Sequence, residues 1–387
     1  MKPSFFLLLV LLVSSLVACE SAARSTADGG VSDVGVARCV PGRSLPCACP
    51  DGASGAQLCR DDGTFAPCSC AGEGPDPLPA YCETTPPRTD TCVSVDLLFV
   101  VDNSLSMAPK QASLTRAFPA FAEDLRRELA GVDTHVMVVD TDGDTGRGLS
   151  ECLQRCEINA TFEPPPGCDV EPFEECFPPE LCAGFDCETP PITERCDRLL
   201  GAGVTFSAGL DAPNVRCTYA TGRRWTTLED PNLVDALSCA ATVGSSGSGN
   251  EAVLGAMVEA FAEGGEGPGG CNEGFFRPDA LLVVVLLSDA SAANGSMEAM
   301  IGDADAFRRE LQALKCNDPN AIVVLGLVGD GDLPGGLCED GLDASPLLRE
   351  LVEGFEDRGF LGSICEEDYA PFLRDAVGLI DRTCDLI

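Results

Sequence analysis

Two uninterrupted apolar runs, each ending on an acid, most constrain how this chain can fold. Residues 97–101 are all apolar and stop at Asp102, and residues 281–287 are all apolar and stop at Ser288 and Asp289. An apolar run without alternation predicts a strand covered on both faces, as in a parallel sheet. In open α/β sheets, ligands bind beyond the carboxyl ends of the strands. The two runs therefore predict an α/β protein with acidic side chains at its ligand-binding edge.

Similar strand and helix patterns alternate through the C-terminal three quarters of the chain. Strands are expected at 95–101, 136–139, 281–287, 321–328 and 359–364, where apolar residues are dense over a short length. Helices are expected where apolar residues recur at three- and four-residue spacing, at 111–129, 233–241, 251–263, 304–314, 347–355 and 369–380. This alternation predicts a doubly wound, mostly parallel sheet flanked by helices.

The N-terminal segment indicates export. Residues 1–18 contain Lys2 and then an apolar core that is short for a membrane span, which is typical of a signal peptide. The four residues that end at Cys19 are similar to the lipobox of bacterial lipoproteins, which implies that Cys19 becomes the lipidated N-terminus. We therefore expect a membrane-anchored lipoprotein of the bacterial cell envelope, facing the periplasm or the cell surface. An ordinary secretory signal with a chance cysteine is the alternative.

Three short segments separate this signal from the main domain. Residues 19–38 are small and polar and are expected to form a lipidated tether. Residues 39–70 contain six cysteines and almost no apolar core, so disulfides would have to hold this module together. It is either a binding module or a rigid spacer, and the lack of an aromatic cluster favours the spacer. Residues 71–93 are a Pro-rich linker, in which Cys82 and Cys92 are expected to close a loop.

Cysteine is unusually frequent for a chain of 387 residues. If Cys19 carries the lipid, the other 22 of the 23 cysteines can all pair, although the sequence leaves their pairing open. Export predicts that they form disulfides. Eight of them lie in an insertion at about 148–224 that interrupts the domain predicted over 94–387 and that has poor periodicity. Structural zinc is not expected, because the chain has one histidine and no zinc-type cysteine spacing.

The chain is strongly acidic. Its formal net charge is −37, from 62 acidic and 25 basic residues. Such a charge repels nucleic acid and anionic membrane surfaces, so nucleic acid is not an expected partner. It favours weak binding of divalent cations, and it is also what an acidic secreted surface without further function would show.

The first apolar strand leads into an Asp-x-Ser-x-Ser motif made by Asp102, Ser104 and Ser106. This motif, the helix that follows it and the distant strand ending in Asp289 together resemble the von Willebrand factor type A domain, over about residues 93–387. The resemblance implies a metal-ion-dependent adhesion site in which these four residues are ligands. Since all four offer oxygen, Mg²⁺ suits them best, with Mn²⁺ or Ca²⁺ as alternatives.

The fifth ligand of that family is usually a threonine in a Gly-rich turn. The corresponding turn begins at Thr242, and Ser245, directly after Gly244, takes the matching place. Thr242 is the alternative ligand. The resemblance implies that the site recognises a protein or glycan partner through an acidic side chain. Simpler readings remain for two of the ligands: Ser106 could cap the following helix, and Asp289 could be an ordinary loop acid.

A second acidic motif follows the strand at 136–139. Asp140, Asp142, Asp144 and Glu151 stand at positions one, three, five and twelve of a calcium-binding loop. Position six should be glycine and is Thr145, so a solvated turn is the preferred interpretation. Alternatively, these acids shape the rim of the site at Asp102.

Enzymatic chemistry is not expected. His135 is the only histidine, starts the second strand and is expected to be a core or edge residue. No Gly-x-Ser-x-Gly nucleophile motif and no phosphate-binding loop with its lysine is present. The sequence therefore predicts a lipid-anchored, non-enzymatic surface protein that binds a partner through Mg²⁺. A structural envelope or assembly component with a vestigial metal site is the alternative.

Overall fold

A computed structural model describes residues 44–48, 54–58, 78–83, 92–142, 194–209, 211–245, 247, 252–262, 269–290, 304–339 and 343–385. The predicted signal peptide, Cys19 and the tether lie outside these residues, as does most of the predicted insertion. Among the helices that are described, none has both the length and the apolar character needed to cross a membrane.

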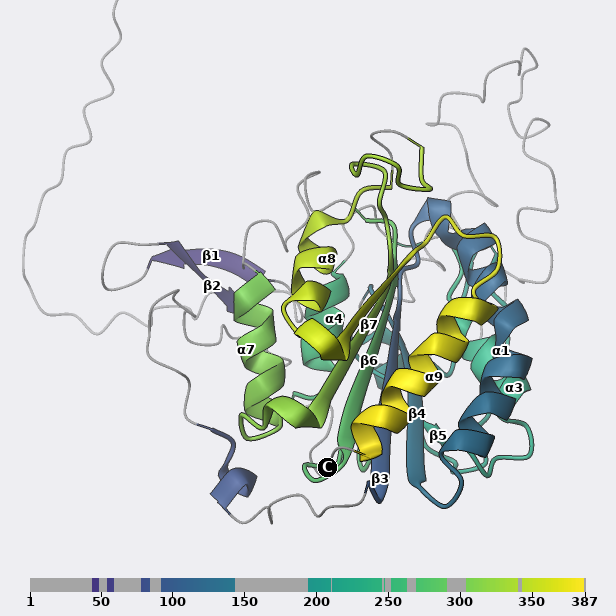
Figure 1. Ribbon diagram of the computed structural model, residues 1–387, viewed down its shortest axis with the longest axis vertical. Helices are drawn as coiled ribbons and strands as arrows, with labels where there is room; N and C mark the ends of the chain where they lie inside the picture. The colour runs from purple at the N-terminus through teal and green to yellow at the C-terminus, as the bar shows by residue number, and fades with distance from the viewer. Residues whose placement is uncertain are drawn as a thin grey trace, which may run out of the picture. The chain divides into compact units, whose positions relative to one another are not determined.

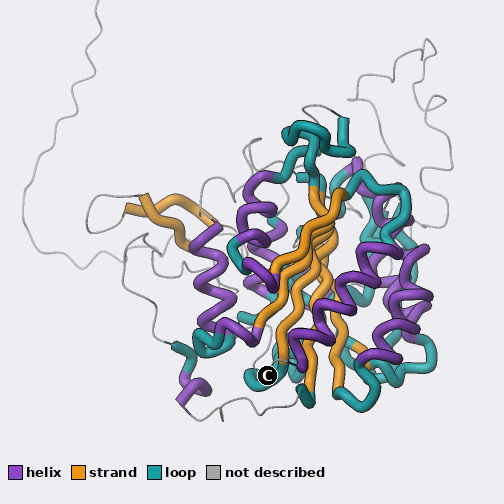
Figure 2. The backbone as a smooth tube through the Cα atoms, in the orientation of Figure 1, coloured by secondary structure: helices purple, strands orange, loops and turns teal. Residues whose placement is uncertain are grey.

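A sheet forms the centre of the domain (Figure 2). It has six strands in the order β5-β4-β3-β6-β7-β8. Its strands are β3 (Ser94–Val101), β4 (Asp133–Asp140), β5 (Thr226–Thr227), β6 (Leu281–Ser288), β7 (Ile322–Val328) and β8 (Gly359–Ser363). All neighbours are parallel except β5, which pairs antiparallel with β4. The prediction of an α/β fold with a mostly parallel sheet is therefore confirmed.

Helices cover both faces of the sheet (Figure 1). Helices α1, α3 and α9 pack on one face, and α4, α7 and α8 pack on the other. Their bounds are Ala108–Glu128 (α1), Leu233–Ala241 (α3), Val253–Glu259 (α4), Ala304–Leu314 (α7), Pro346–Glu353 (α8) and Ala370–Asp385 (α9). Each corresponds to a predicted helix, with differences only at the ends.

Strand β3 shows why its sequence lacks alternation. Leu97 and Phe99 pack among the side chains of α1, α3 and α9, whereas Leu98 and Val100 pack among those of α4, α7 and α8. All four are fully buried, because both faces of the sheet are covered. Apolar side chains therefore fill the carboxyl-terminal part of the strand, and Asp102 is the first residue beyond its carboxyl end.

The six-cysteine segment 39–70 contains an antiparallel pair of strands, β1 (Ser44–Ala48) and β2 (Ser54–Leu58). The pairing runs from Ser44 opposite Leu58 to Ala48 opposite Ser54. The disulfides predicted for this segment lie outside the described residues.

Two disulfides at the amino edge of the sheet correct the prediction for the linker. Cys82 pairs with Cys316, and Cys92 pairs with Cys384 at the end of α9, so the expected loop between Cys82 and Cys92 is wrong. Chain segments far apart in sequence meet at this edge, and the cysteines bond across them. Three further disulfides are described: Cys196–Cys271, Cys217–Cys239 and Cys338–Cys365.

The last part of the predicted insertion packs onto the domain. Val204 donates its backbone N–H to the carbonyl of Val138 in β4 (2.7 Å), and Phe206 is buried. The disulfides of Cys196 and Cys217 join this stretch to Cys271 and to Cys239 in α3. Residues 194–224 are thus a covalently fastened edge of the domain and are not peripheral to it.

Candidate metal centre

Asp102 lies at the carboxyl end of β3 and is fully buried. Its Oδ1 accepts a hydrogen bond from the backbone N–H of Ser104 (2.7 Å), and its Oδ2 accepts one from the hydroxyl of Ser288 (2.6 Å). Both of these donors are neutral. A buried carboxylate with only neutral donors keeps an uncompensated negative charge, which is costly in a low-dielectric interior.

Asp289 brings a second carboxylate to the same place. It follows β6 directly, and because β3 and β6 are neighbouring parallel strands in register, their carboxyl ends coincide. Burial, and then the negative charge of Asp289, raise the pKa of Asp102 to about 6, although hydrogen bonds from Ser288 and Ser104 lower it. Two carboxylates are therefore held within electrostatic range of one another, as predicted from the two acid-terminated strands.

Ser104 and Ser106 add two hydroxyls beside Asp102. Their Oγ atoms are 3.4 Å apart, and Ser106 is exposed while Ser104 is half-buried. Neither hydroxyl caps a helix: the residue before α1 is Met107, and no side chain caps that end or the short 3-10 helix Leu105–Met107. The alternative reading of Ser106 as a helix cap is therefore wrong, and both hydroxyls lie at the carboxyl edge without that structural task.

The turn that contains Ser245 is bound to the end of β3. The side chain of Gln111 donates to the carbonyls of Asp102 (2.9 Å) and Gly244 (2.8 Å), and it accepts from the backbone N–H of Gly244 (3.1 Å). Gly247 donates its backbone N–H to the carbonyl of Asn103 (2.9 Å). A side chain at Gly247 would collide with Asn103, so this approach requires glycine.

Within that turn, the hydroxyl of Ser245 donates to Oδ2 of Asp211 (2.5 Å). Ser245 is buried, and the carboxylate it meets comes from the insertion. The alternative ligand, Thr242, donates its hydroxyl to the carbonyl of Ser238 at the end of α3 (2.7 Å). The structure therefore places the Ser245 turn beside Asp102. The Thr242 hydroxyl instead forms a hydrogen bond at the end of α3.

A lysine already contacts one of the two carboxylates. Lys110, in the first turn of α1, donates to Asp289 and to Asp343 (2.9 Å to Oδ2). Burial lowers the pKa of Lys110, but the two carboxylates more than offset this, and its pKa is raised above the ordinary value. The ammonium is thus held charged between Asp289 and Asp343.

Sequence reasoning did not identify Lys110, Gln111, Asp211 or Asp343. Gln111 could have been found, because it precedes Leu114 on the apolar face of a helix, where a polar residue is out of place. Asp211 and Asp343 carry no local signal, since they reach the site only through the fold.

The second acidic motif is described only in part. Asp140 ends β4 and is buried, and burial followed by the charge of Asp142 raises its pKa well above the ordinary value. Asp144 and Glu151 lie outside the described residues, so the calcium loop stays a prediction. His135 is buried in β4, between its partners Asp96 in β3 and Thr227 in β5, and it stacks on Trp225 with ring centroids 3.9 Å apart.

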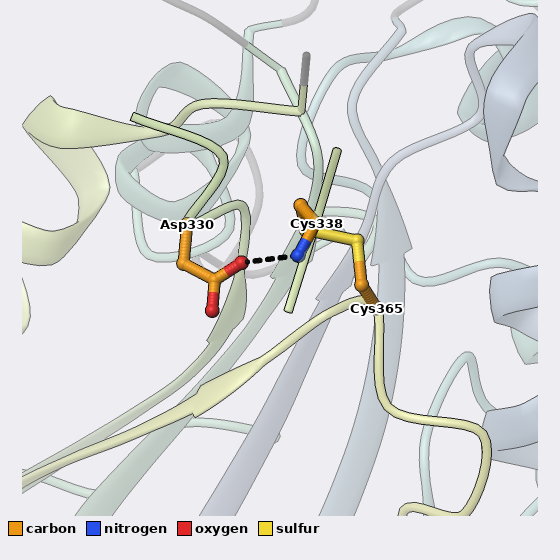
Figure 3. A group of neighbouring side chains, drawn as sticks. All are labelled: Asp330, Cys338 and Cys365. Atoms are coloured by element: carbon orange, nitrogen blue, oxygen red, sulfur yellow. Dashed lines mark hydrogen bonds between the residues drawn. A yellow bond between two sulfur atoms is a disulfide. The ribbon is translucent and has the colours of Figure 1, made fainter. Parts of the chain in front are cut away.

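Asp330, Cys338 and Cys365 form the one group of potential metal ligands of mixed type among the described residues (Figure 3). The two cysteines are joined in a disulfide with an S–S distance of 2.02 Å, so neither offers a thiolate. Asp330 accepts backbone hydrogen bonds from Cys338 (2.9 Å) and Leu337 (3.0 Å). The group closes a loop and is not a metal site.

Comparison of the sequence with protein-family models and with curated proteins found no match.

Proposed function

We propose that this chain is a lipid-anchored surface protein whose domain at 94–387 is of the von Willebrand type A kind and binds a partner through a divalent cation. The observation that carries the proposal is the meeting of Asp102 and Asp289 at the ends of neighbouring strands, with the hydroxyls of Ser104 and Ser106 beside Asp102. The turn of Ser245, bound to the end of β3 through Gln111, completes the set.

The donor set fits Mg²⁺. It consists of hydroxyl and carboxylate oxygens, which are the ligands of hard cations, and it contains no thiolate or imidazole. Asp102 keeps room for a cation beside its hydrogen bonds from Ser104 and Ser288, because a carboxylate offers about four lone-pair sites. A bound cation would supply positive charge to a buried carboxylate that otherwise has only neutral donors. Mn²⁺ or Ca²⁺ could take the same place.

A partner would complete such a site with an acidic group. Ser106 is exposed, so the hydroxyl end of the site is open to solvent. The proposed partner is a protein or glycan outside the cytoplasm, and a bound cation would offset the repulsion between an anionic group and a chain of net charge −37.

Placement in the envelope is supported by the signal-like segment 1–18, by Cys19 and by the disulfides of the folded domain. Disulfides persist in oxidising compartments and are rare where thiols are kept reduced.

A structural role with a vestigial metal site is the second candidate, and one observation favours it. Lys110 already balances the charge of Asp289, so part of the site is satisfied without a metal.

Calorimetric titration of the oxidised chain with Mg²⁺ or Mn²⁺ separates the two candidates. We expect the wild type to bind, Asp102→Asn to lose binding at least about tenfold while remaining folded, and Asp305→Asn to bind like the wild type. Asp305 is a matched control because it removes the same charge from an exposed position on α7. A wild type without metal uptake would favour the structural role.

Capture of partners from an envelope extract then tests recognition. The oxidised wild type should retain a partner in Mg²⁺ and release it in chelator, and Asp102→Asn should retain it in neither. Equal capture by both forms in chelator would contradict a metal-dependent role.

A further inference from the structure

Lys110 occupies a position that a cation does not favour by itself. It lies in the first turn of α1, where the helix dipole is positive and repels an ammonium group. Its side chain is only 13% exposed. What holds it there is the pair of carboxylates, Asp289 from the end of β6 and Asp343 from the loop between β7 and α8. The two carboxylates therefore offset both the helix dipole and the burial of the ammonium.

The loop that carries Asp343 is fastened to the same edge of the sheet. The hydroxyl of Ser345 donates to the carbonyl of Ala290 (2.9 Å), just after Asp289, and accepts from the backbone N–H of Gly329 (3.2 Å). The disulfide Cys338–Cys365 closes the loop against the end of β8. Asp343 is thus a second, fixed carboxylate partner for Lys110 besides Asp289.

We propose that Lys110 is an internal counter-cation that competes with the divalent cation for Asp289 and so sets the affinity of the site for metal. This inference rests on the proposed function. The ammonium and a divalent cation cannot both use the same face of the Asp289 carboxylate, because like charges at that distance repel strongly. Metal binding therefore requires Lys110 to leave Asp289, while Asp343 can keep it at the rim.

The choice of lysine suits an exchangeable cation. Its ammonium is a strongly hydrated point charge on a flexible stem, whereas an arginine would bind a carboxylate in a fixed bidentate pair. The whole chain has only three lysines, among 25 basic residues. A metal ion would displace a lysine from Asp289 at a lower cost in free energy than it would displace an arginine.

Calorimetric titration of Lys110→Met with Mg²⁺ is the test. Removing the competitor should raise the affinity for Mg²⁺ by about tenfold or more relative to wild type. Arg116→Met is the matched control, because it removes one positive charge from an exposed position on the same helix; its affinity should stay within about twofold of wild type. Unchanged or weaker binding by Lys110→Met, with normal binding by wild type, overturns the inference and leaves the proposed function standing.

A second measurement on the wild type does not depend on the variant folding. The labelling rate of Lys110 is compared with that of Lys315, which is 2% exposed and serves as an internal reference. An amine-reactive ester, followed by mass spectrometry, should label Lys110 faster in Mg²⁺ than in chelator and leave the rate at Lys315 unchanged. Equal labelling of Lys110 at a Mg²⁺ concentration that saturates the site overturns the inference.

The other possible results of the two titrations also test the inference and the proposed function. Metal binding by Lys110→Met but not by wild type supports the inference and contradicts the metal-dependent function of the natural chain. No binding by either folded form overturns both proposals.

Discussion

The two ends of strand β3 carry the same residue in opposite circumstances. Asp96, near the amino end, and Asp102, beyond the carboxyl end, are both fully buried. Asp96 accepts hydrogen bonds from the backbone N–H and the guanidinium of Arg277 (2.7 and 2.8 Å), and Lys315 adds a further positive charge. Asp102 accepts hydrogen bonds from neutral donors, the hydroxyl of Ser288 and the backbone N–H and hydroxyl of Ser104, and it faces a second carboxylate.

This difference distinguishes a structural charge from one that is available for binding. For Asp96, burial raises the pKa, and the charges of Lys315 and Arg277 act against that rise. For Asp102, burial and Asp289 both raise the pKa, and only neutral donors oppose them. At the amino edge, basic side chains therefore balance the charge of Asp96, whereas at the carboxyl edge the described contacts of Lys110 are with Asp289 and Asp343.

The largest effect is expected from Arg277→Met. It would leave Asp96 buried without its guanidinium partner, and breaking a buried pair in this way costs about 3–5 kcal/mol of unfolding free energy. Urea unfolding of the oxidised chain, followed by circular dichroism, measures the change. A loss below about 1 kcal/mol would mean that Lys315 alone compensates Asp96, and the contrast between the two ends would be weaker than stated.

A pH-dependent effect of intermediate size is expected from Asp102. Its pKa is about 6 in the fold against an ordinary 3.8, so the folded state binds the proton more tightly than the unfolded state. The stabilisation from this proton is fully present below about pH 4 and is lost as pH rises through 6. In chelator, the wild type should therefore lose about 1–3 kcal/mol relative to Asp102→Asn between pH 4 and pH 7.

Urea unfolding of both forms at several pH values measures this difference, because the other carboxyl groups are common to both. Saturating Mg²⁺ should restore the stability of the wild type at pH 7 and leave Asp102→Asn unchanged. Parallel stability curves for the two forms in chelator would show that the charge of Asp102 is compensated after all.

The smallest effect is expected from Asp133→Asn. Asp133 also contacts Arg277 (2.6 Å), but its side chain is 65% exposed, whereas that of Asp96 is fully buried. An exposed ion pair contributes about 0–1 kcal/mol, so this variant should be nearly as stable as the wild type. The same urea titration at two salt concentrations checks it. A loss as large as that of Arg277→Met would mean that burial is not what distinguishes the two partners.

The regular elements were accessible from sequence because each depends on neighbouring residues. The apolar run 281–287 became β6, and the three- and four-residue spacing at 233–241 and 304–314 became α3 and α7 with the same bounds. The acid-terminated strands predicted that Asp102 and Asp289 would meet, since parallel neighbours end at the same edge. The disulfide expected between Cys82 and Cys92 is wrong because disulfide pairing does not depend on neighbouring residues: their partners lie 234 and 292 residues away.

The sequence by itself determined the class of fold, the burial of the strands on both faces and the positions of acids and hydroxyls at the carboxyl edge. Only the tertiary structure decided how those charges are balanced: Arg277 at Asp96, Lys110 between Asp289 and Asp343, and Gln111 between the end of β3 and the Ser245 turn. Periodicity and strand-end residues are properties of a local stretch of chain. The partner of a buried charge is set by which distant segments the packed core brings within a few ångströms, and no local pattern records that.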